Sequence, residues 1–187
     1  MARMCRPGPG HRGAVMADQG GGPADAVDDR PDEPFETRVE AHRALLSVVV
    51  DQRPAMAWFS ADFRYWPLND RGFIRALEIW ALRDPNRPSA LRMLAVDWRD
   101  VRARFPRFAA FRRDFSHVIE CRVIRAALIA DLPEFAWTGS RAIIAHRPAW
   151  TSGRQIVAPA RLTALRNGFE PIWEQALPDF PASILGL

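Results

Sequence analysis

Residues 56–96, MAWFSADFRYWPLNDRGFIRALEIWALRDPNRPSALRMLAV, decide the fold. The segment opens with a short apolar run, 56–60, of the kind that forms a buried strand. Asn69 or Asp70 can cap a helix after it. Apolar residues at helical spacing then form one stripe: Phe73, Ile74, Leu77, Trp80 and Ala81. A second apolar run, 91–96, follows, so the order strand, helix, strand predicts a crossover between two parallel strands.

Helices are expected on both sides of this segment. Thr37 and Glu40 have the spacing of a capping box, and the helix they begin ends at Pro54. Its expected apolar positions are Val39, Leu46, Val49 and Val50. Asp97 is expected to cap a third helix, which Pro106 splits or kinks. The stripe of that helix is Val101, Phe105, Phe108, Phe111 and Phe115.

The C-terminal third predicts antiparallel strands. Residues 117–124 alternate between apolar and polar side chains, and residues 134–138 and 141–146 form a hairpin around Gly139-Ser140. A short strand near 155–157 precedes a helix that starts at Pro159 and breaks at 168–171. Together the elements predict an α/β fold, with a mixed sheet and helices on both faces.

Composition predicts one folded domain, 35–187, behind a disordered tail, 1–34, that is rich in Gly, Pro, Asp and Arg. No apolar run is long enough for a membrane span and no secretory signal is present, so we expect a cytoplasmic protein. Two cysteines are too few for a disulfide scaffold or a cysteine zinc site, and Cys121 is expected in the core. No cofactor or metal site is expected.

All 26 basic residues are arginine. The chain therefore has no lysine for a Schiff base, for a phosphate-binding P-loop or for general base catalysis. Residues 35–187 carry 22 arginines against 16 acidic residues, a net charge of +6. A basic surface is one typical footprint of a protein that binds anions.

Four segments resemble a family of uncharacterised proteobacterial proteins: 59–68 (FSADFRYWPL), 105–108 (FPRF), 116–121 (SHVIEC) and 180–187 (FPASILGL). Related domains of that family are fused to GNAT-type acetyltransferases. The family in turn is distantly similar to one half of the phospholipase D-like fold. The resemblance implies such a half-domain, and a homodimer by analogy with the way these halves pair.

Phospholipase D enzymes use a His-x-Lys motif followed by an Asp, in which the His attacks phosphorus and the Lys binds the phosphate charge. The resemblance places this motif just before or within residues 126–146. That region has no lysine, its only histidine is His146 at the far end, and Asp131 stands alone. No residue can be carried over, so the resemblance implies a domain without phosphodiesterase chemistry.

The aromatic loop after the first strand is the first candidate site, because ligands bind open α/β sheets outside the carboxyl ends of the strands. The candidate ligand or partner surface consists of Asp62, Phe63, Arg64, Tyr65 and Trp66. The alternative is a loop that packs onto the core with its aromatic rings buried.

An arginine-rich segment is the second candidate. Six arginines lie between residues 99 and 113, and Arg99, Arg102 and Arg113 are expected to face solvent and bind an anion. The alternative is a solvated face opposite the phenylalanine stripe.

Histidine and cysteine give weaker signals. His117 and Cys121 on one strand lie too far apart for a direct hydrogen bond. His42, His117 and His146 match no compact metal motif.

Three functions follow from these features. The first is a non-catalytic binding or regulatory module for an anionic ligand or a protein partner. The second is an enzyme of phosphoryl or acyl chemistry with unidentified residues, and the third is weak nucleic-acid binding through the arginines.

Overall fold

The structure is a computed structural model that describes residues 1, 32–51, 53–129, 132–146 and 149–182. Within these ranges, eight strands form one sheet in the order β1-β7-β6-β5-β2-β3-β4-β8. The strands are β1 (Glu33–Phe35), β2 (Met56–Ser60), β3 (Leu91–Ala95), β4 (Ile119–Val123), β5 (Phe135–Trp137), β6 (Ala142–Ala145), β7 (Gly153–Ile156) and β8 (Leu177–Pro178). The helices are α1 (Arg38–Val50), α2 (Arg71–Leu82), α3 (Val101–Arg104), α4 (Pro106–Asp114), α5 (Pro159–Gln175) and the 3-10 turn η1 (Ala126–Leu128).

The centre of the sheet is parallel. Strand β2 pairs with β3, and β3 with β4, both in parallel register, so Ser60, Ala95 and Val123 end side by side at the carboxyl edge. The remaining pairs are antiparallel, including the β5–β6 hairpin. The predicted crossover, hairpin and mixed sheet are therefore confirmed. The antiparallel orientation predicted for 117–124 was wrong, because β4 follows α3 and α4 in a second crossover and pairs parallel with β3.

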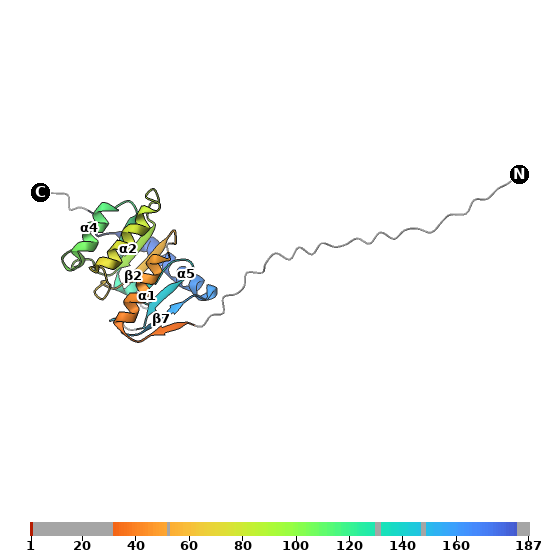
Figure 1. Cartoon of the computed structure of the whole chain (residues 1–187), viewed down its shortest axis with the longest axis horizontal. Helices are drawn as coiled ribbons and strands as arrows, with labels where there is room; N and C mark the ends of the chain where they lie inside the picture. Colours follow the sequence, from red (N-terminus) through yellow and green to blue (C-terminus); the bar gives the residue numbers. More distant parts are fainter. Residues whose placement is uncertain (2–31, 52, 130–131, 147–148, 183–187) are drawn as a thin grey trace.

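Each face of the sheet has its own helices. On β2, Met56 and Trp58 belong to the core beneath α1, α2 and α4, whereas Ala57 and Phe59 pack with Phe169 of α5. Figure 1 shows α1, α2 and α4 together over one side of the sheet. This is the arrangement of helices on both faces that the sequence predicts, and it follows from the two-residue repeat of a strand buried on both sides.

Local sequence signals set several element boundaries. Thr37 and Glu40 form the capping box of α1, and the Asp70 side chain accepts a hydrogen bond from the backbone N–H of Phe73 at the start of α2. The five stripe residues predicted for α2 are its buried residues. The split at Pro106 is also confirmed, because α3 ends at Arg104 and α4 begins at Pro106.

Four further expectations were wrong in detail. Helix α1 buries Ala41, Leu45, Val48 and Val49, while Val39 and Val50 are exposed, because α1 packs with a different side of its surface against the sheet. Helix α5 continues through Pro171, since Phe169 and Trp173 on either side of it are both buried in one cluster.

Asp97 does not cap a helix. Its carboxylate accepts hydrogen bonds from the backbone N–H and the guanidinium of Arg99, and α3 begins only after Asp100. Regular structure also starts before residue 35, because β1 begins at Glu33 and pairs with β7. The rest of the predicted tail, 2–31, lies outside the described residues.

Candidate functional site

The carboxyl edge of β2 meets the start of β5 at a half-buried carboxyl group, that of Glu134. The Glu134 Oε1 atom accepts hydrogen bonds from the Ser60 hydroxyl (2.9 Å) and from the Ala61 backbone N–H (2.9 Å). Its Oε2 atom accepts one from Trp150 Nε1 (2.7 Å). Trp150 is fully buried, so one carboxylate joins the end of β2, the start of β5 and the segment after β6. We call this arrangement the Glu134 lock.

Burial is the main influence on the protonation of the Glu134 carboxyl group. Burial, with a smaller contribution from the charge of Asp62, raises the pKa of Glu134 above 4.5, although three donated hydrogen bonds act in the opposite direction. The three donated hydrogen bonds make Glu134 a junction between the end of β2, the start of β5 and Trp150.

A hollow of about 470 Å³ opens beside the Glu134 lock. Its walls are mostly apolar, from Phe59, Ile129, Leu132, Pro133 and Ile144, and its polar side chains are Glu134 and His146. Arg154 Nε donates to His146 Nε2 (2.9 Å), and burial together with Arg154 lowers the pKa of His146. The part of 126–146 that the structure describes therefore presents a carboxyl group and a histidine whose Nε2 atom already accepts a hydrogen bond from Arg154.

The aromatic loop candidate is mostly interior. Phe63 and Trp66 are 0% and 3% exposed, and they stack with Trp58, Trp98 and Trp150 in the main core. Tyr65 is half-buried, and its carbonyl oxygen lies 2.8 Å from His42 Nε2. Asp62 and Arg64 form an ion pair with each other on the surface. The rings therefore cap the core, and only the Asp62–Arg64 pair and part of Tyr65 remain accessible.

The arginine-rich segment, residues 97–114, lies on the surface at α3 and α4. It carries six arginines and three aspartates. Arg99 pairs with Asp97 and lowers the pKa of that carboxyl to about 2; Arg113 pairs with Asp114. The side chains of Arg99 and Arg113 are 88% and 64% exposed. The expected orientation toward solvent is confirmed for these two residues.

Arg102 differs from the other two candidates. Its Nη2 atom donates to the carbonyl of Pro181, and its guanidinium lies 5.4 Å from the ring centroid of Phe180. Phe180 in turn stacks on Trp98 and Phe108. Arg102 therefore holds Phe180 and Pro181 against the core.

The histidines and Cys121 occupy separate places. Cys121 is buried on β4, and burial raises the pKa of its thiol to about 12. His117 is exposed before β4, while His42 and His146 have the contacts given above. Within the described ranges, no three His, Cys, Asp or Glu side chains are grouped to hold a metal ion.

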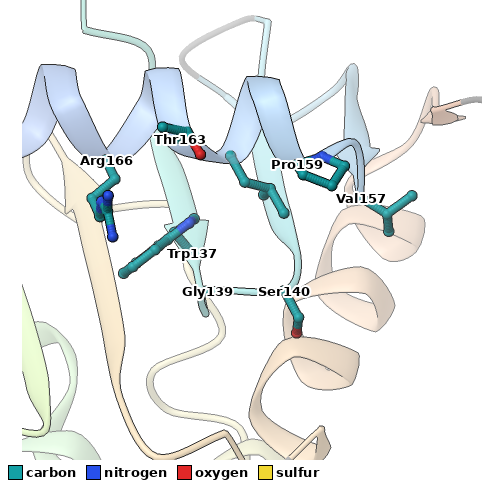
Figure 2. Close-up of a pocket in the computed structure, with 8 residues that line it drawn as sticks. Trp137, Gly139, Ser140, Val157, Pro159, Thr163 and Arg166 are labelled. Carbon is teal, nitrogen blue, oxygen red and sulfur yellow. The ribbon is translucent and has the colours of Figure 1, made fainter. Parts of the chain in front are cut away.

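A second hollow, which the sequence did not indicate, lies at the other end of the β5–β6 hairpin, under the first half of α5 (Figure 2). It has a volume of about 370 Å³ and is lined by residues far apart in the chain: Trp137, Gly139, Ser140, Val157, Pro159, Leu162, Thr163 and Arg166. Because β5 and α5 are brought together only by the fold, no local motif could have revealed it. We call it the α5 pocket.

Comparison with solved structures identifies the fold. The Helicobacter pylori protein NucT matches with a TM-score of 0.56 at 9% identity, over 80% of this chain and 99% of NucT. Nuc from Salmonella typhimurium, a phospholipase D family member, matches with a TM-score of 0.50 at 9% identity, over 80% of this chain and 97% of Nuc. The fold is phospholipase D-like. This agrees with the similarity that the sequence segments implied.

A third match is TrmBL2, an archaeal chromatin protein whose structure shows a novel mode of DNA binding. The TM-score is 0.57 at 7% identity, over 82% of this chain, which spans 56% of TrmBL2. No protein-family model matches the chain, and no curated protein matches its sequence. The link to domains fused with acetyltransferases stays a prediction.

The described helices were also compared with the requirements of a membrane span. None of them has the length and apolar character to cross a bilayer.

Proposed function

We propose that this chain is a non-catalytic binding domain of phospholipase D-like fold, and that its ligand is nucleic acid held through the arginine-rich segment. The observation that carries the proposal is the charge balance of residues 97–114, where six arginines face three aspartates. The segment has a net charge of +3, and five of its six arginines are at least partly exposed, whereas Arg112 is buried and donates to the carbonyl of Ser116.

The ion pairs within the segment are weak enough for its arginines to exchange aspartate for a phosphate partner. Exposed arginine–carboxylate pairs contribute at most about 1 kcal/mol, because water and salt screen them. A phosphate can accept two parallel hydrogen bonds from a guanidinium, so a nucleic-acid backbone can replace aspartate as the partner of Arg99 or Arg113. Arg102 is less available, since it holds Pro181 and Phe180.

The Glu134 lock supports the non-catalytic part of the proposal. Phosphodiester hydrolysis in this fold needs a histidine nucleophile and a lysine for the phosphate charge, whereas Leu132, Pro133 and Glu134 directly precede β5 here. A carboxylate repels a phosphodiester. TrmBL2 supports the binding part, because a chromatin protein of the same fold shows DNA binding in its structure.

The arginines favour nucleic acid over the other ligands that the sequence suggested. A protein partner docking on the aromatic loop would need exposed rings, and Phe63 and Trp66 are buried. Binding through arginine and phosphate alone carries no base readout, so we expect low sequence preference.

The test is the fluorescence anisotropy of a short labelled DNA duplex. The Arg99→Glu, Arg113→Glu double variant should bind at least about tenfold more weakly than the wild type at low salt. A matched charge reversal outside the segment, Arg53→Glu with Arg125→Glu, changes the net charge equally and should weaken binding much less. Equal losses in the two variants would contradict the segment as the site, and no binding by the wild type would contradict the proposal.

A further inference from the structure

The α5 pocket combines an aromatic wall with unused hydrogen-bond donors. Trp137 on β5 and Arg166 on α5 both line it, and in Figure 2 the Arg166 side chain extends from the helix toward the indole ring. Val157, Pro159 and Leu162 complete the apolar part of its lining. A volume of about 370 Å³ is within the usual range for a small-molecule site.

Two donors of the α5 pocket, Trp137 Nε1 and the Arg166 guanidinium, have no acceptor within the described chain, whereas the Ser140 hydroxyl donates to Asp51. Trp137 Nε1 is enclosed and has no hydrogen-bond partner. The carboxylate one turn beyond Arg166, at Glu170, is taken by both guanidinium nitrogens of Arg92, each at 2.7 Å. The lining of the pocket contains no acidic residue. This distribution of charge favours an anion.

The start of α5 also favours an anion in the α5 pocket. Its N-cap residue, Ala158, has no side chain to accept a hydrogen bond from the helix, and the first turn has no acidic residue. The positive end of the helix dipole is therefore uncompensated beside the pocket, at Pro159.

We infer that the α5 pocket binds a nucleoside monophosphate, with the base against the indole of Trp137 and the phosphate at Arg166. A planar base stacks on an indole without needing a specific edge, and a guanidinium binds phosphate through two parallel hydrogen bonds. The apolar wall accommodates the base, and Thr163 adds a hydroxyl to the lining of the pocket. This site is separate from the arginine-rich segment, so it is tested independently of the proposed function.

The experiment is isothermal titration calorimetry of the full chain with three probes: adenosine 5′-monophosphate, adenosine, and inorganic phosphate. Adenosine monophosphate should bind about tenfold or more tightly than phosphate, because only the nucleotide stacks on Trp137. It should also bind more tightly than adenosine, which lacks the group that Arg166 recognises. Phosphate binding as tightly as the nucleotide, or no nucleotide binding at all, would overturn the inference.

Variants locate the binding. Arg166→Gln should weaken adenosine monophosphate binding at least about tenfold, and Thr163→Trp, at an exposed helix position, should block the pocket without entering the core. Arg125→Gln is the matched control and should leave binding unchanged. The Arg99→Glu, Arg113→Glu variant should retain nucleotide binding. A loss in the Arg125 control equal to that in Arg166→Gln would overturn the assignment of the site.

Discussion

At one end of the β5–β6 hairpin the Glu134 carboxyl accepts hydrogen bonds from three donors, while at the other end Trp137 Nε1 has no acceptor. The first end is closed, because protein groups meet each other's hydrogen-bonding needs, and it corresponds to the edge where phosphodiesterase chemistry would be expected from the resemblance. The second end is open in this sense, because Trp137 Nε1 lacks a partner and Arg166 lines a hollow. The comparison shows that hydrogen-bonding groups are satisfied at the first end and left over at the second.

Removing the Glu134 carboxyl should give the largest effect. Glu134→Ala leaves the Ser60 hydroxyl, the Ala61 N–H and the Trp150 N–H without an acceptor, and should lower the free energy of unfolding by about 3–5 kcal/mol. At the open end, Arg166→Ala should change it by less than about 0.5 kcal/mol. Urea unfolding of both variants measures the difference, and equal losses would contradict the contrast between the two ends.

A glycine lies beside each end of the hairpin, Gly153 at the first and Gly139 at the second, and substitution of each compares the two ends. A Cβ at Gly153, which pairs with Ala145, would lie 2.2 Å from the carbonyl oxygen of Ile144 and 2.2 Å from Phe35. Gly153→Ala should therefore cost about 2–3 kcal/mol through overpacking. Gly139 has open space around it but a φ of +48°, so Gly139→Ala should cost only about 1 kcal/mol of backbone strain. Thermal unfolding that ranked Gly139→Ala as the more damaging variant would contradict this account.

The pH dependence of the free energy of unfolding should report the protonation state of Glu134. Its folded pKa is raised above 4.5, so its favourable contribution is fully present below pH 4.5 and is lost as the pH rises through the folded pKa. Glu134→Gln removes this titration. The wild type should therefore lose stability relative to Glu134→Gln as the pH rises above 4.5, as followed by melting temperature. A relative gain by the wild type over that range would contradict burial as the dominant influence.

The smallest expected effect is on catalysis. Purified protein should hydrolyse a generic phosphodiester such as bis(p-nitrophenyl) phosphate no faster than buffer, and His117→Ala and His146→Ala should change nothing. Turnover that survives repurification and disappears in His146→Ala would show that the closed edge carries chemistry, and its loss in His117→Ala would place chemistry before β4; either result would contradict the account.

Local patterns predicted the elements well because their signals lie within a few residues. The Asp70 cap, the α2 stripe and the hairpin around Gly139-Ser140 are each specified by adjacent positions. Trp80 and Phe108, both in predicted stripes, are 3% and 0% exposed. The Pro171 break was wrong because tertiary burial of Phe169 and Trp173 outweighs the local signal.

The sites were harder to predict because they depend on residues distant in sequence. Glu134 meets Ser60 and Ala61 only after β2 and β5 pair, and Trp137 meets Arg166 only after α5 covers the sheet. The aromatic loop was predicted to be a candidate binding surface, yet the rings of Phe63 and Trp66 belong to the core. The arginine-rich segment could be recognised from the sequence because an excess of charge is a property of composition.

The salt dependence of DNA binding tests the central claim most directly. If Arg99 and Arg113 each neutralise one phosphate, the logarithm of the binding constant should fall against the logarithm of salt concentration with a slope of about −1.8. Affinity should then drop about 12-fold between about 50 and about 200 mM salt, with the DNA recovered uncleaved. A slope near zero, or cleavage of the DNA, would contradict the account.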